Sequence, residues 1–412
     1  MVNIKPFKGF RPPIDIAEKV ASPPYDVVNS KEAKKIASNN LYSYLHIIKP
    51  EIDLPDNINI YDDKVYLKGS ENLKSFVDKK CLKQDKTNCF YVYSQKLNEH
   101  EQTGLVAGAS VEDYKQDIIK KHEHTRPDKE NDRTRHVDTL NANTGPVFLT
   151  YKKQVSIDAI IEKVCRTNPC YDFITEDAVH HKFWVISNPD TISLIQKEFE
   201  GVEFLYVADG HHRSASAVRV QKERMLKNPL HTGNEEYNYF LSVIFPDNQM
   251  QIMAYNRVVN SLNGLSNTVF LEKIREKFEI EEAQEPQPGK IHSLAMFLDN
   301  KWYKLKPFKH LFDEQDVVEH LDVSILQKQI LEPILGIKNP RTDKRISFVG
   351  GIKGLKALEE KVKENKEGVA FALFPVTMQD IMAVSDEGKT MPPKSTWFEP
   401  KLRSGLITKP LI

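Results

Sequence analysis

The pattern of apolar and polar positions predicts a β-hairpin in the first third of the chain. Residues 90–97 (FYVYSQKL) and 104–110 (GLVAGAS) are rich in β-branched, aromatic and small apolar residues, and the polar residues 98–103 separate them. Such a pair of runs is typical of two antiparallel strands joined by a turn. Upstream, the Pro-Pro pairs at 12–13 and 23–24 predict extended or turn segments, because consecutive prolines cannot lie inside a helix.

The centre of the chain alternates between strand and helix patterns. Asn188-Pro189 is typical of a helix start, with proline at the first helical position, and Gly201 is typical of a helix end. The order strand–helix–strand–turn–helix predicts a βαβα unit with Asp209–Arg213 at the turn. The expected elements are strands at 182–187 (KFWVIS) and 203–208 (EFLYVA) and helices at 190–200 and 214–225.

Further elements on both sides of this unit make the expected class mixed α/β, with substantial antiparallel content. We expect a charged helix over 112–123 and then a long polar loop that ends near residue 145. Thr377, with Asp380 three residues later, predicts a capped helix. The remaining expectations are strands at 146–151 and 369–374, hairpins at 239–245 with 249–256 and at 291–298 with 302–305, and a helix over 323–334 interrupted by Pro333.

Length and charge narrow the functional classes. The 412 residues exceed the size of one typical domain, and we expect three consecutive regions, at 1–88, 89–260 and 261–412. The 58 Lys and Arg balance the 58 Asp and Glu. A dedicated nucleic-acid binder normally carries a basic excess, so no nucleic-acid partner is expected.

The hydrophobicity and the cysteine content of the sequence indicate the cellular compartment in which the protein is expected. No apolar run of about eighteen residues occurs, so no membrane span is expected. The four cysteines form no C-x-x-C pair and are too few for a disulfide scaffold. Reduced thiols and a cytoplasmic location are the corresponding expectation.

The first block with candidate chemistry is 208–213 (ADGHHR), where a buried strand gives way to a helix. Gly210 permits a tight turn there, and a helix N-terminus favours anions through its free N–H groups and its dipole. Asp209 is suited to a Mg²⁺ ion or to orienting a histidine. A solvated basic first turn is the alternative. Cations are disfavoured at the N-terminus of a helix. The sequence nevertheless places three cationic or potentially cationic side chains there, and this predicts an anionic ligand. They are His211, His212 and Arg213.

The second block is 122–133 (HEHTRPDKENDR). Its histidines are two residues apart rather than four, which excludes the zincin motif. Glu123 is a candidate general base if it lies within hydrogen-bond reach of a hydroxyl. Composition alone slightly favours a charged surface loop, although loops of this length are often functional.

The third block is 391–405 (MPPKSTWFEPKLRSG). Its three prolines stiffen the backbone, and Lys394 beside two hydroxyls resembles a phosphate clamp in its chemistry. Just upstream, residues 383–390 (AVSDEGKT) have Ala where a P-loop has its first Gly, and Pro392-Pro393 follows where a helix would have to begin. We therefore reject a P-loop.

Together these blocks resemble the serine kinase (SerK-like) branch of the ParB/sulfiredoxin superfamily, whose kinases carry DGHHR. The strings that resemble one such branch are PPYDV (23–27), HEHTRPDKENDR (122–133), NANTGPVFLTY (141–151), ADGHHR (208–213) and MPPKSTWFEPKLRSG (391–405). The resemblance implies a ParB/SerK-like catalytic core at 89–260, with the N-terminal and C-terminal extensions packed around it. It also implies phosphorylation of free L-serine by pyrophosphate or ADP.

The resemblance further implies that the turn at Asp209–Arg213 binds donor phosphates and that a glutamate deprotonates the serine hydroxyl. We expect Glu123 to be this base, Asp209 and His212 to be further catalytic residues, and Asp209 to hold Mg²⁺. The expected phosphate-binding residues are Gly210, His211, His212, Arg213, Lys394, Ser395, Thr396, Lys401 and Arg403. The expected serine-binding residues are Tyr25, Arg126 and Asn143.

Pyrophosphate is favoured over ADP or ATP, because the blocks supply many phosphate-binding groups and no readable adenine or ribose signature. The expected product is O-phospho-L-serine, for serine and cysteine metabolism. Two alternatives of other classes stay open. One is a ParB-like, nucleotide-dependent DNA-binding module, and the other is a metal-dependent hydrolase built on the histidine-rich blocks.

Overall fold

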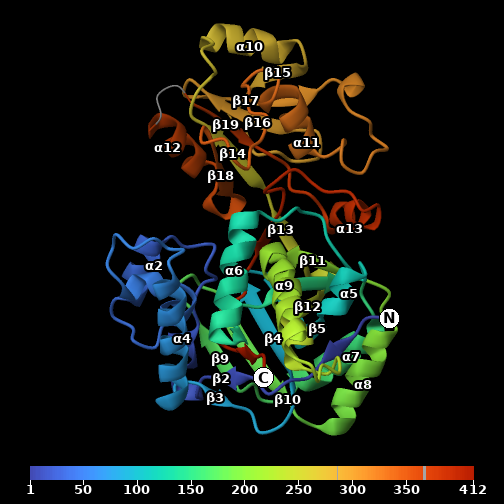
Figure 1. Cartoon of the computed structure of the whole chain (residues 1–412). Helices are drawn as coiled ribbons and strands as arrows, with labels where there is room; N and C mark the ends of the chain where they lie inside the picture. Colours follow the sequence, from blue (N-terminus) through green and yellow to red (C-terminus); the bar gives the residue numbers. More distant parts are fainter. Residues whose placement is uncertain (285, 365–367) are drawn as a thin grey trace. The chain divides into compact units, whose positions relative to one another are not determined.

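The computed structural model of the protein describes residues 1–284, 286–364 and 368–412, and it has the predicted mixed α/β class (Figure 1). Two compact units divide the chain. Unit 1 comprises Met1–Lys121, Thr125–Met250 and Pro400–Ile412, and unit 2 comprises His122–His124 and Gln251–Glu399. The units are therefore not the consecutive regions expected from the sequence, because unit 1 includes both the N-terminal region and the C-terminal segment.

Unit 1 is built on a nine-stranded sheet. Its strands are β1 (Ile4–Lys5), β4 (Phe90–Leu97), β5 (His100–Ser110), β6 (Ile119–Lys120), β8 (Val147–Tyr151), β9 (Tyr171–Ile174), β10 (His180–Ile186), β11 (Leu205–Asp209) and β12 (Tyr239–Pro246). The order is β6-β11-β8-β12-β5-β4-β10-β9, with β1 also paired to β5. The hairpin β4–β5 confirms the first prediction, and Asn98 at its turn has a φ of 56°.

Helices pack on this sheet and extend beyond it (Figure 1). The predicted helix after Asn188 is α8 (Pro189–Glu200), whose cap is confirmed by a 2.9 Å hydrogen bond from the Thr191 amide to the Asn188 side chain. The helix after the central turn is α9 (His211–Lys227). The other helices of unit 1 are α1 (Ala17–Val20), α2 (Ser30–Ala37), α3 (Leu45–Ile48), α4 (Asp63–Asp78), α5 (Val111–Lys115), α6 (Pro127–Leu140) and α7 (Val155–Cys165).

The helix α6 corrects the expectation of a long polar loop between residues 122 and 145. Pro127 occupies its first helical position, and Asn141 ends it in the left-handed conformation. Most of the residues that α6 buries are polar: Asp132, Arg133, Thr134 and His136, beside Val137 and Leu140. Because its buried face is not apolar, the helix lacks the hydrophobic period by which helices are recognised in a sequence.

Two further expectations are wrong. The helix over 112–123 ends at Lys115, since Asp117 has a φ of 59° and β6 follows directly. The hairpin of 239–245 with 249–256 does not form, because β12 lies in the middle of the sheet with both edges paired, to β5 and β8. The residues after β12 instead pair within unit 2.

Unit 2 has a six-stranded sheet with the order β15-β17-β16-β19-β14-β18. Its strands are β14 (Tyr255–Val259), β15 (Phe278–Glu282), β16 (Leu294–Leu298), β17 (Lys301–Pro307), β18 (Ile346–Gly350) and β19 (Val369–Ala372), and a separate pair joins β13 (Gln251–Met253) to β20 (Trp397–Glu399). The pair β16–β17 confirms the second predicted hairpin. The helices are α10 (Asn267–Arg275), α11 (Asp322–Leu326), α12 (Lys356–Glu364) and α13 (Met378–Asp386).

Local signals in unit 2 behave as expected. The helix α13 begins with the predicted capping box between Thr377 and Asp380. The helix predicted over 323–334 is α11 followed by a π-helical turn at Gln327–Leu331, directly before Pro333. A proline removes a backbone donor, so a change of helix type at this point has a local cause.

The C-terminal segment 400–412 is fastened into unit 1 by backbone pairing. Its strand β21 (Lys409–Pro410) pairs with β7 (Ala142–Asn143), and Ser404 exchanges hydrogen bonds with Ser22 at 2.9 and 3.0 Å. The Lys409 side chain is fully buried and forms a 2.8 Å ion pair with Glu236. Burial lowers the pKa of Lys409 to about 8, against the opposing effect of Glu236.

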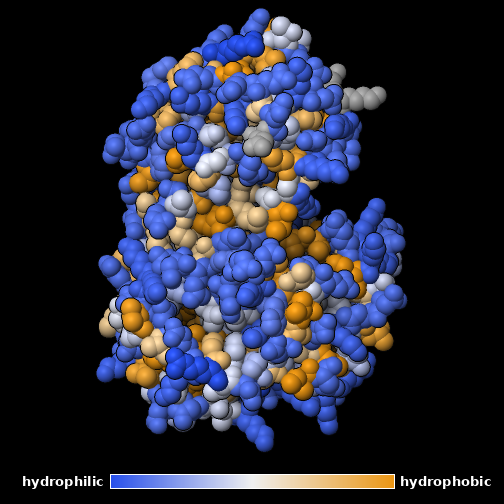
Figure 2. All heavy atoms as spheres, turned by 180° about the vertical axis from the view of Figure 1, so that it is seen from behind, coloured by the Kyte–Doolittle hydropathy of each residue, from blue (hydrophilic) through white to orange (hydrophobic). Residues whose placement is uncertain are grey.

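The viewed surface is mainly polar, and the cysteine thiols are free. The face turned toward the viewer in Figure 2 is largely hydrophilic, with scattered apolar side chains. Among the described residues, no helix combines the length and the apolar character that a membrane span requires. The cysteines Cys81, Cys89, Cys165 and Cys170 are all free.

The buried pair in unit 1 gives a stability prediction. Glu236→Gln should lower the free energy of unfolding by about 3 kcal/mol, because Lys409 would then either be buried as an unpaired cation or have to give up its proton. Lys409→Met should cost clearly less, because Glu236 keeps a second partner, Lys5, at 2.9 Å. Urea unfolding of both variants at neutral pH measures the difference, and equal losses would contradict the argument.

Candidate functional site

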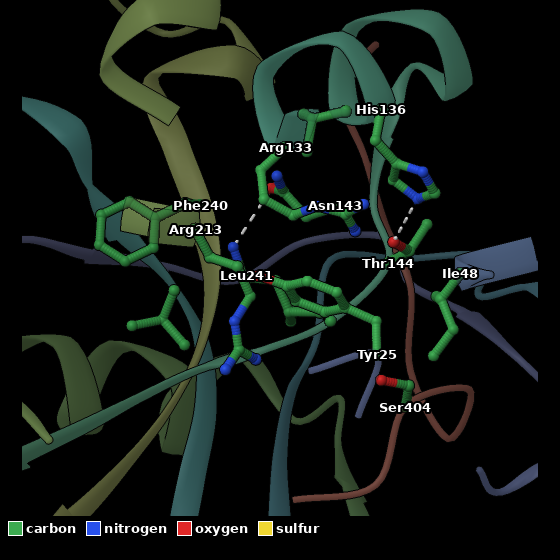
Figure 3. Close-up of a pocket in the computed structure, with 13 residues that line it drawn as sticks. Tyr25, Ile48, Arg133, His136, Asn143, Thr144, Arg213, Phe240, Leu241 and Ser404 are labelled. Carbon is green, nitrogen blue, oxygen red and sulfur yellow. Dashed lines mark hydrogen bonds between the residues drawn. The ribbon is translucent and has the colours of Figure 1, made fainter. Parts of the chain in front are cut away.

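A pocket in unit 1 brings together residues from distant parts of the chain (Figure 3). It encloses about 20 Å³, which is enough for roughly one water molecule. Its lining comes from the loop before α2, from α3, α6, α9, β12, the segment around β7 and β8, and the C-terminal segment. The lining residues are Tyr25, Ile48, Arg133, His136, Val137, Asn143, Thr144, Gly145, Val147, Arg213, Phe240, Leu241 and Ser404.

One side of the pocket is a buried arginine on α6. Arg133 is only 8 % exposed, and its Nε and Nη2 donate to Asp132 at 3.0 and 2.7 Å. Its guanidinium lies 4.0 Å from the centre of the Tyr25 ring. Burial alone would lower the pKa of Arg133, but Tyr25 and Asp132 raise it, while burial raises the pKa of Tyr25. The pair is therefore an arginine cation against a neutral phenol.

Neutral polar groups continue the lining from α6 to β7. The Nε2 atom of His136 lies 3.1 Å from the Thr144 hydroxyl, and burial lowers the pKa of His136 well below its usual value, with Arg133 adding to the effect. The Asn143 side-chain oxygen accepts a 3.2 Å hydrogen bond from the Leu241 amide. The amide NH₂ group of Asn143 is a donor that this bond does not use.

The opposite side is the start of α9, where the sequence predicts an anion site. Gly210 caps the helix with a φ of 103°, a conformation that glycine adopts at no steric cost. The Arg213 side chain packs on this glycine, and its Nη1 donates to the Pro146 carbonyl. Its Nη2 is 3.9 Å from Asp209 and 4.0 Å from Asp26. The buried Nε of Arg213 has no hydrogen-bond partner among the described residues.

Asp209 ends β11 beside this arginine. Its Oδ2 accepts a 3.2 Å hydrogen bond from Nζ of Lys401, which the C-terminal segment brings back into unit 1. His212, in the first turn of α9, accepts at Nε2 from the Arg126 amide at 3.1 Å. The turn predicted to bind phosphates is thus lined by a lysine that follows it by 192 positions in the sequence.

The charge around the pocket favours a small anion. Two guanidinium groups, Arg133 and Arg213, line it, and no carboxylate belongs to its lining in the described part of the chain. Guanidinium groups bind carboxylate and phosphate oxygens in a fixed planar geometry. The enclosed space admits about one water-sized group, so a single oxygen atom of an oxyanion fits inside it and a bulky ligand does not.

The carboxylates near the pocket can be tested against magnesium. Mg²⁺ in phosphoryl-transfer sites usually takes one or two carboxylates and completes its shell with phosphate oxygens and water. Asp209 and Asp26 both approach Arg213, and both are partly exposed. They fit an ion that is bound mainly through the phosphates of a donor, and they do not form a complete all-protein cage.

Several predicted residues lie away from this pocket. Arg403 donates to Thr175 at 3.2 Å and forms an ion pair with Asp177, so its side chain is engaged beside β9 and β10. The side chain of Arg126 pairs with Asp128 at 2.9 Å and is substantially exposed. Of the predicted serine-binding residues, Tyr25 and Asn143 line the pocket.

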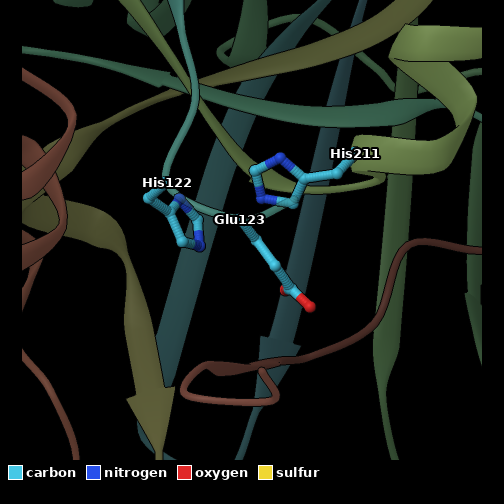
Figure 4. Close-up of side chains that lie close together, drawn as sticks. All are labelled: His122, Glu123 and His211. Carbon is cyan, nitrogen blue, oxygen red and sulfur yellow. The ribbon is translucent and has the colours of Figure 1, made fainter. Parts of the chain in front are cut away.

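Other predicted residues belong to unit 2. His122 is buried and its carbonyl accepts a 2.8 Å hydrogen bond from the Met391 amide, while Glu123 is the next residue of the same segment (Figure 4). Figure 4 also labels His211, the first residue of α9 in unit 1. The loop that carries Lys394, Ser395 and Thr396 lies in unit 2 as well, where the Ser395 hydroxyl donates to the Pro392 carbonyl at 2.6 Å.

The sequence analysis assigned no role to four polar residues of the pocket: Arg133, His136, Thr144 and Ser404. Arg133, His136 and Val137 have the spacing i, i+3, i+4, which places them on one face of a helix. That spacing was the available signal, but it has meaning only once α6 is recognised as a helix. Ser404 had no comparable signal, because its neighbour Arg403 has the stronger phosphate-binding chemistry.

Comparison with protein-family models shows the family to which this chain belongs. Residues 4–324 match a family described as "Protein of unknown function (DUF1015)". The chain belongs to the DUF1015 family. No curated protein matches the sequence.

Comparison with solved structures finds matches to the DUF1015 chain at low identity and low TM-score. A free serine kinase in complex with AMP is 15 % identical, with 68 % of this chain and 84 % of that chain covered and a TM-score of 0.34. SbnI from Staphylococcus aureus is 13 % identical (72 % and 84 % covered, TM-score 0.38), and a conserved hypothetical protein from Pyrococcus furiosus is 14 % identical (70 % and 90 % covered, TM-score 0.35). These TM-scores are below 0.5, so the function proposed below rests on this chain's own residues.

The geometry at Gly210 gives a prediction. A Cβ atom there would lie 3.1 Å from Nε and 3.2 Å from Cζ of Arg213, in a backbone conformation that alanine tolerates poorly. Gly210→Ala should cost about 1–2 kcal/mol of stability, and it should weaken the binding of an oxyanion probe, pyrophosphate, at the predicted anion site at least tenfold. Gly233→Ala is the matched control, since Gly233 has a φ of 91° but nothing within 4 Å.

Urea unfolding measures the stability loss, and calorimetric titration with pyrophosphate measures the affinity. The control should show a similar loss of stability with unchanged affinity. Equal affinity in the two variants would contradict the role of the Gly210–Arg213 contact.

Proposed function

We propose that this DUF1015 protein transfers a phosphoryl group from pyrophosphate to the hydroxyl of free L-serine and so forms O-phospho-L-serine. One observation carries the proposal. Each of the five sequence blocks that resemble the serine kinase branch contributes a residue to the pocket of unit 1. These residues are Tyr25, Arg133, Asn143, Arg213 and Ser404.

Phosphoryl transfer needs positioning and charge neutralisation more than covalent help from the protein. In the proposal, donor oxygens bind to the first turn of α9 and to Arg213, whose buried Nε has no hydrogen-bond partner among the described residues. Lys401 adds a second cation, since it already lies 3.2 Å from Asp209 in the same turn. Binding an anion here would supply the partner that the buried guanidinium needs.

The acceptor would be held by groups suited to a small zwitterion. The hydrogen bond that Asn143 accepts does not use its amide NH₂ group as a donor, and Tyr25 and Ser404 add hydroxyl groups. Arg133 is available for the serine carboxylate, because only its Nε and Nη2 are used by Asp132. The sequence analysis named Arg126, and not Arg133, among the serine-binding residues.

The proposed reaction balances without a further reactant. The serine oxygen forms a bond to a phosphorus of pyrophosphate, and the bridging P–O bond breaks. Orthophosphate leaves with the electron pair, and Glu123 accepts the hydroxyl proton as general base. Magnesium, when bound with the donor, neutralises phosphate charge, and Asp209 is the residue that would contribute to holding it.

A donor and acceptor screen tests the proposal. Wild-type protein is incubated with L-serine, Mg²⁺ and either pyrophosphate, ADP or ATP, and ³¹P NMR detects phosphoserine. Phosphoserine from pyrophosphate is the expected result. If phosphoserine forms with ADP or ATP but not with pyrophosphate, the donor is a nucleotide and not pyrophosphate. If no phosphoserine forms with any of the three donors, the proposed function is wrong.

The proposed base gives a separate prediction. Glu123→Gln should reduce kcat at least a hundredfold while the Kd of pyrophosphate changes less than threefold, because only the proton acceptor is lost. Steady-state kinetics and calorimetric titration provide the two numbers. A near-normal kcat would remove Glu123 from this role.

The donor clamp gives another prediction. Arg213→Lys should raise the KM of pyrophosphate about tenfold or more, because a lysine cannot supply the planar guanidinium donors. Arg219→Lys is the matched control on the same helix, where the contacts of Arg219 among the described residues are with Asn131 and Glu130. A normal pyrophosphate KM in Arg213→Lys would contradict the clamp.

A further inference from the structure

Unit 2 buries an arginine in the middle of its sheet. Arg257 lies on β14, which pairs with β18 on one side and β19 on the other, and the residue is only 2 % exposed. Replacing a buried ionic group by an apolar side chain of similar size is often neutral or stabilising. An arginine at this position therefore points to a task that an apolar residue would not perform.

The described contacts of Arg257 are unusual for a buried cation. Its Nη1 donates to the Tyr255 carbonyl and its Nη2 donates to the Pro393 carbonyl at 3.1 Å. No carboxylate among the described residues forms an ion pair with it. Burial lowers the pKa of Arg257 to about 10, while the charges of Tyr255 and Glu123 act in the opposite direction. The negative charge of Glu123 thus acts in favour of the Arg257 cation, after the larger effect of Tyr255.

The Pro393 carbonyl belongs to the third sequence block. In the same loop, the Met391 amide donates to the His122 carbonyl at 2.8 Å, which ties the loop to the residue before Glu123. The loop is also held at its other end, because Trp397 packs edge-on against Tyr255 with ring centres 5.0 Å apart. Arg257 therefore contacts the loop that is directly bonded to the segment carrying Glu123.

We propose that Arg257 is a positioning residue for Glu123: its guanidinium holds the Pro393 carbonyl, this fixes the loop bonded to His122, and its charge favours the carboxylate of the neighbouring glutamate. The proposal gives the third block a role that its phosphate-clamp chemistry does not describe. It rests on the proposed function in one respect, since Glu123 matters for turnover only if it is the base.

The kinetic test uses Arg257→Met, Arg257→Lys and Glu123→Gln in the full-length protein. Arg257→Met should lower kcat on the order of a hundredfold, because small displacements of a reacting group have effects of this size. The pyrophosphate KM should change less than threefold, since the donor groups belong to unit 1. Arg257→Lys should recover at least a tenth of wild-type kcat, because it keeps a charge and a donor.

The double variant separates positioning from general damage. If Arg257 acts through Glu123, Arg257→Met should have no further effect on kcat in the Glu123→Gln background. Additive losses would overturn the proposal, as would a normal kcat in Arg257→Met. Lys304→Ala, at an exposed position of β17, is the control for a lost cation in unit 2 and should behave as wild type.

A second measurement does not depend on activity. Hydrogen exchange of the Met391 amide reports its bond to His122, and Arg257→Met should accelerate it at least tenfold while the amides of β16 and β17 keep their protection. Unchanged exchange at Met391 would overturn the proposal even if the enzyme is a serine kinase. Accelerated exchange in a protein without kinase activity would leave the structural role of Arg257 intact and would refute only the proposed function.

Discussion

Every cation that this fold buries has to be compensated, and unit 1 meets this requirement unevenly. Arg133 has Asp132 within hydrogen-bond distance, and Lys409 has Glu236. Arg213 donates a hydrogen bond to one backbone carbonyl, and the two nearest carboxylates, those of Asp209 and Asp26, lie about 4 Å away. Its compensation is therefore the weakest of the three, and a bound oxyanion is the natural completion. The case for an anion at this pocket thus rests on this deficit rather than on any single motif.

The same pocket depends on chain segments that are distant in sequence. Ser404 reaches it because its backbone pairs with Ser22, and Asn143 reaches it on β7, which pairs with β21. Lys401 approaches Asp209 for the same reason. The pairing of residues 400–412 within unit 1 thus positions three polar groups, although residues 251–399 of unit 2 separate this segment from the rest of unit 1 in the sequence.

Local signals made part of this structure predictable. The hairpin β4–β5, the cap of α8 and the capping box at Thr377 each depend on a few neighbouring residues, and all three are confirmed. The helix α6 was missed because it buries polar side chains, and the pairing of β12 was missed because its partners are distant in sequence. Both errors arise where tertiary contacts, and not local pattern, decide the outcome.

The residues of the candidate site also fall into those that the sequence could indicate and those that only the fold reveals. The cations at the start of α9 stood out in the sequence, since helix N-termini disfavour them without an anion. The roles of Arg403 and Ser404 could not be separated from the sequence, because only the fold decides that Arg403 reaches Asp177 while its neighbour faces the pocket. Side-chain direction in an irregular segment has no periodicity to reveal it.

The split of unit 1 around unit 2 has a consequence for biosynthesis. Residues 251–399 emerge from the ribosome before the segment that completes the pocket, and at roughly 5–20 residues per second this delay lasts on the order of ten seconds or more. During that interval β7 lacks its partner strand β21, and the pocket lacks Ser404. The lining of the pocket is therefore completed only after the whole of unit 2 has been synthesised.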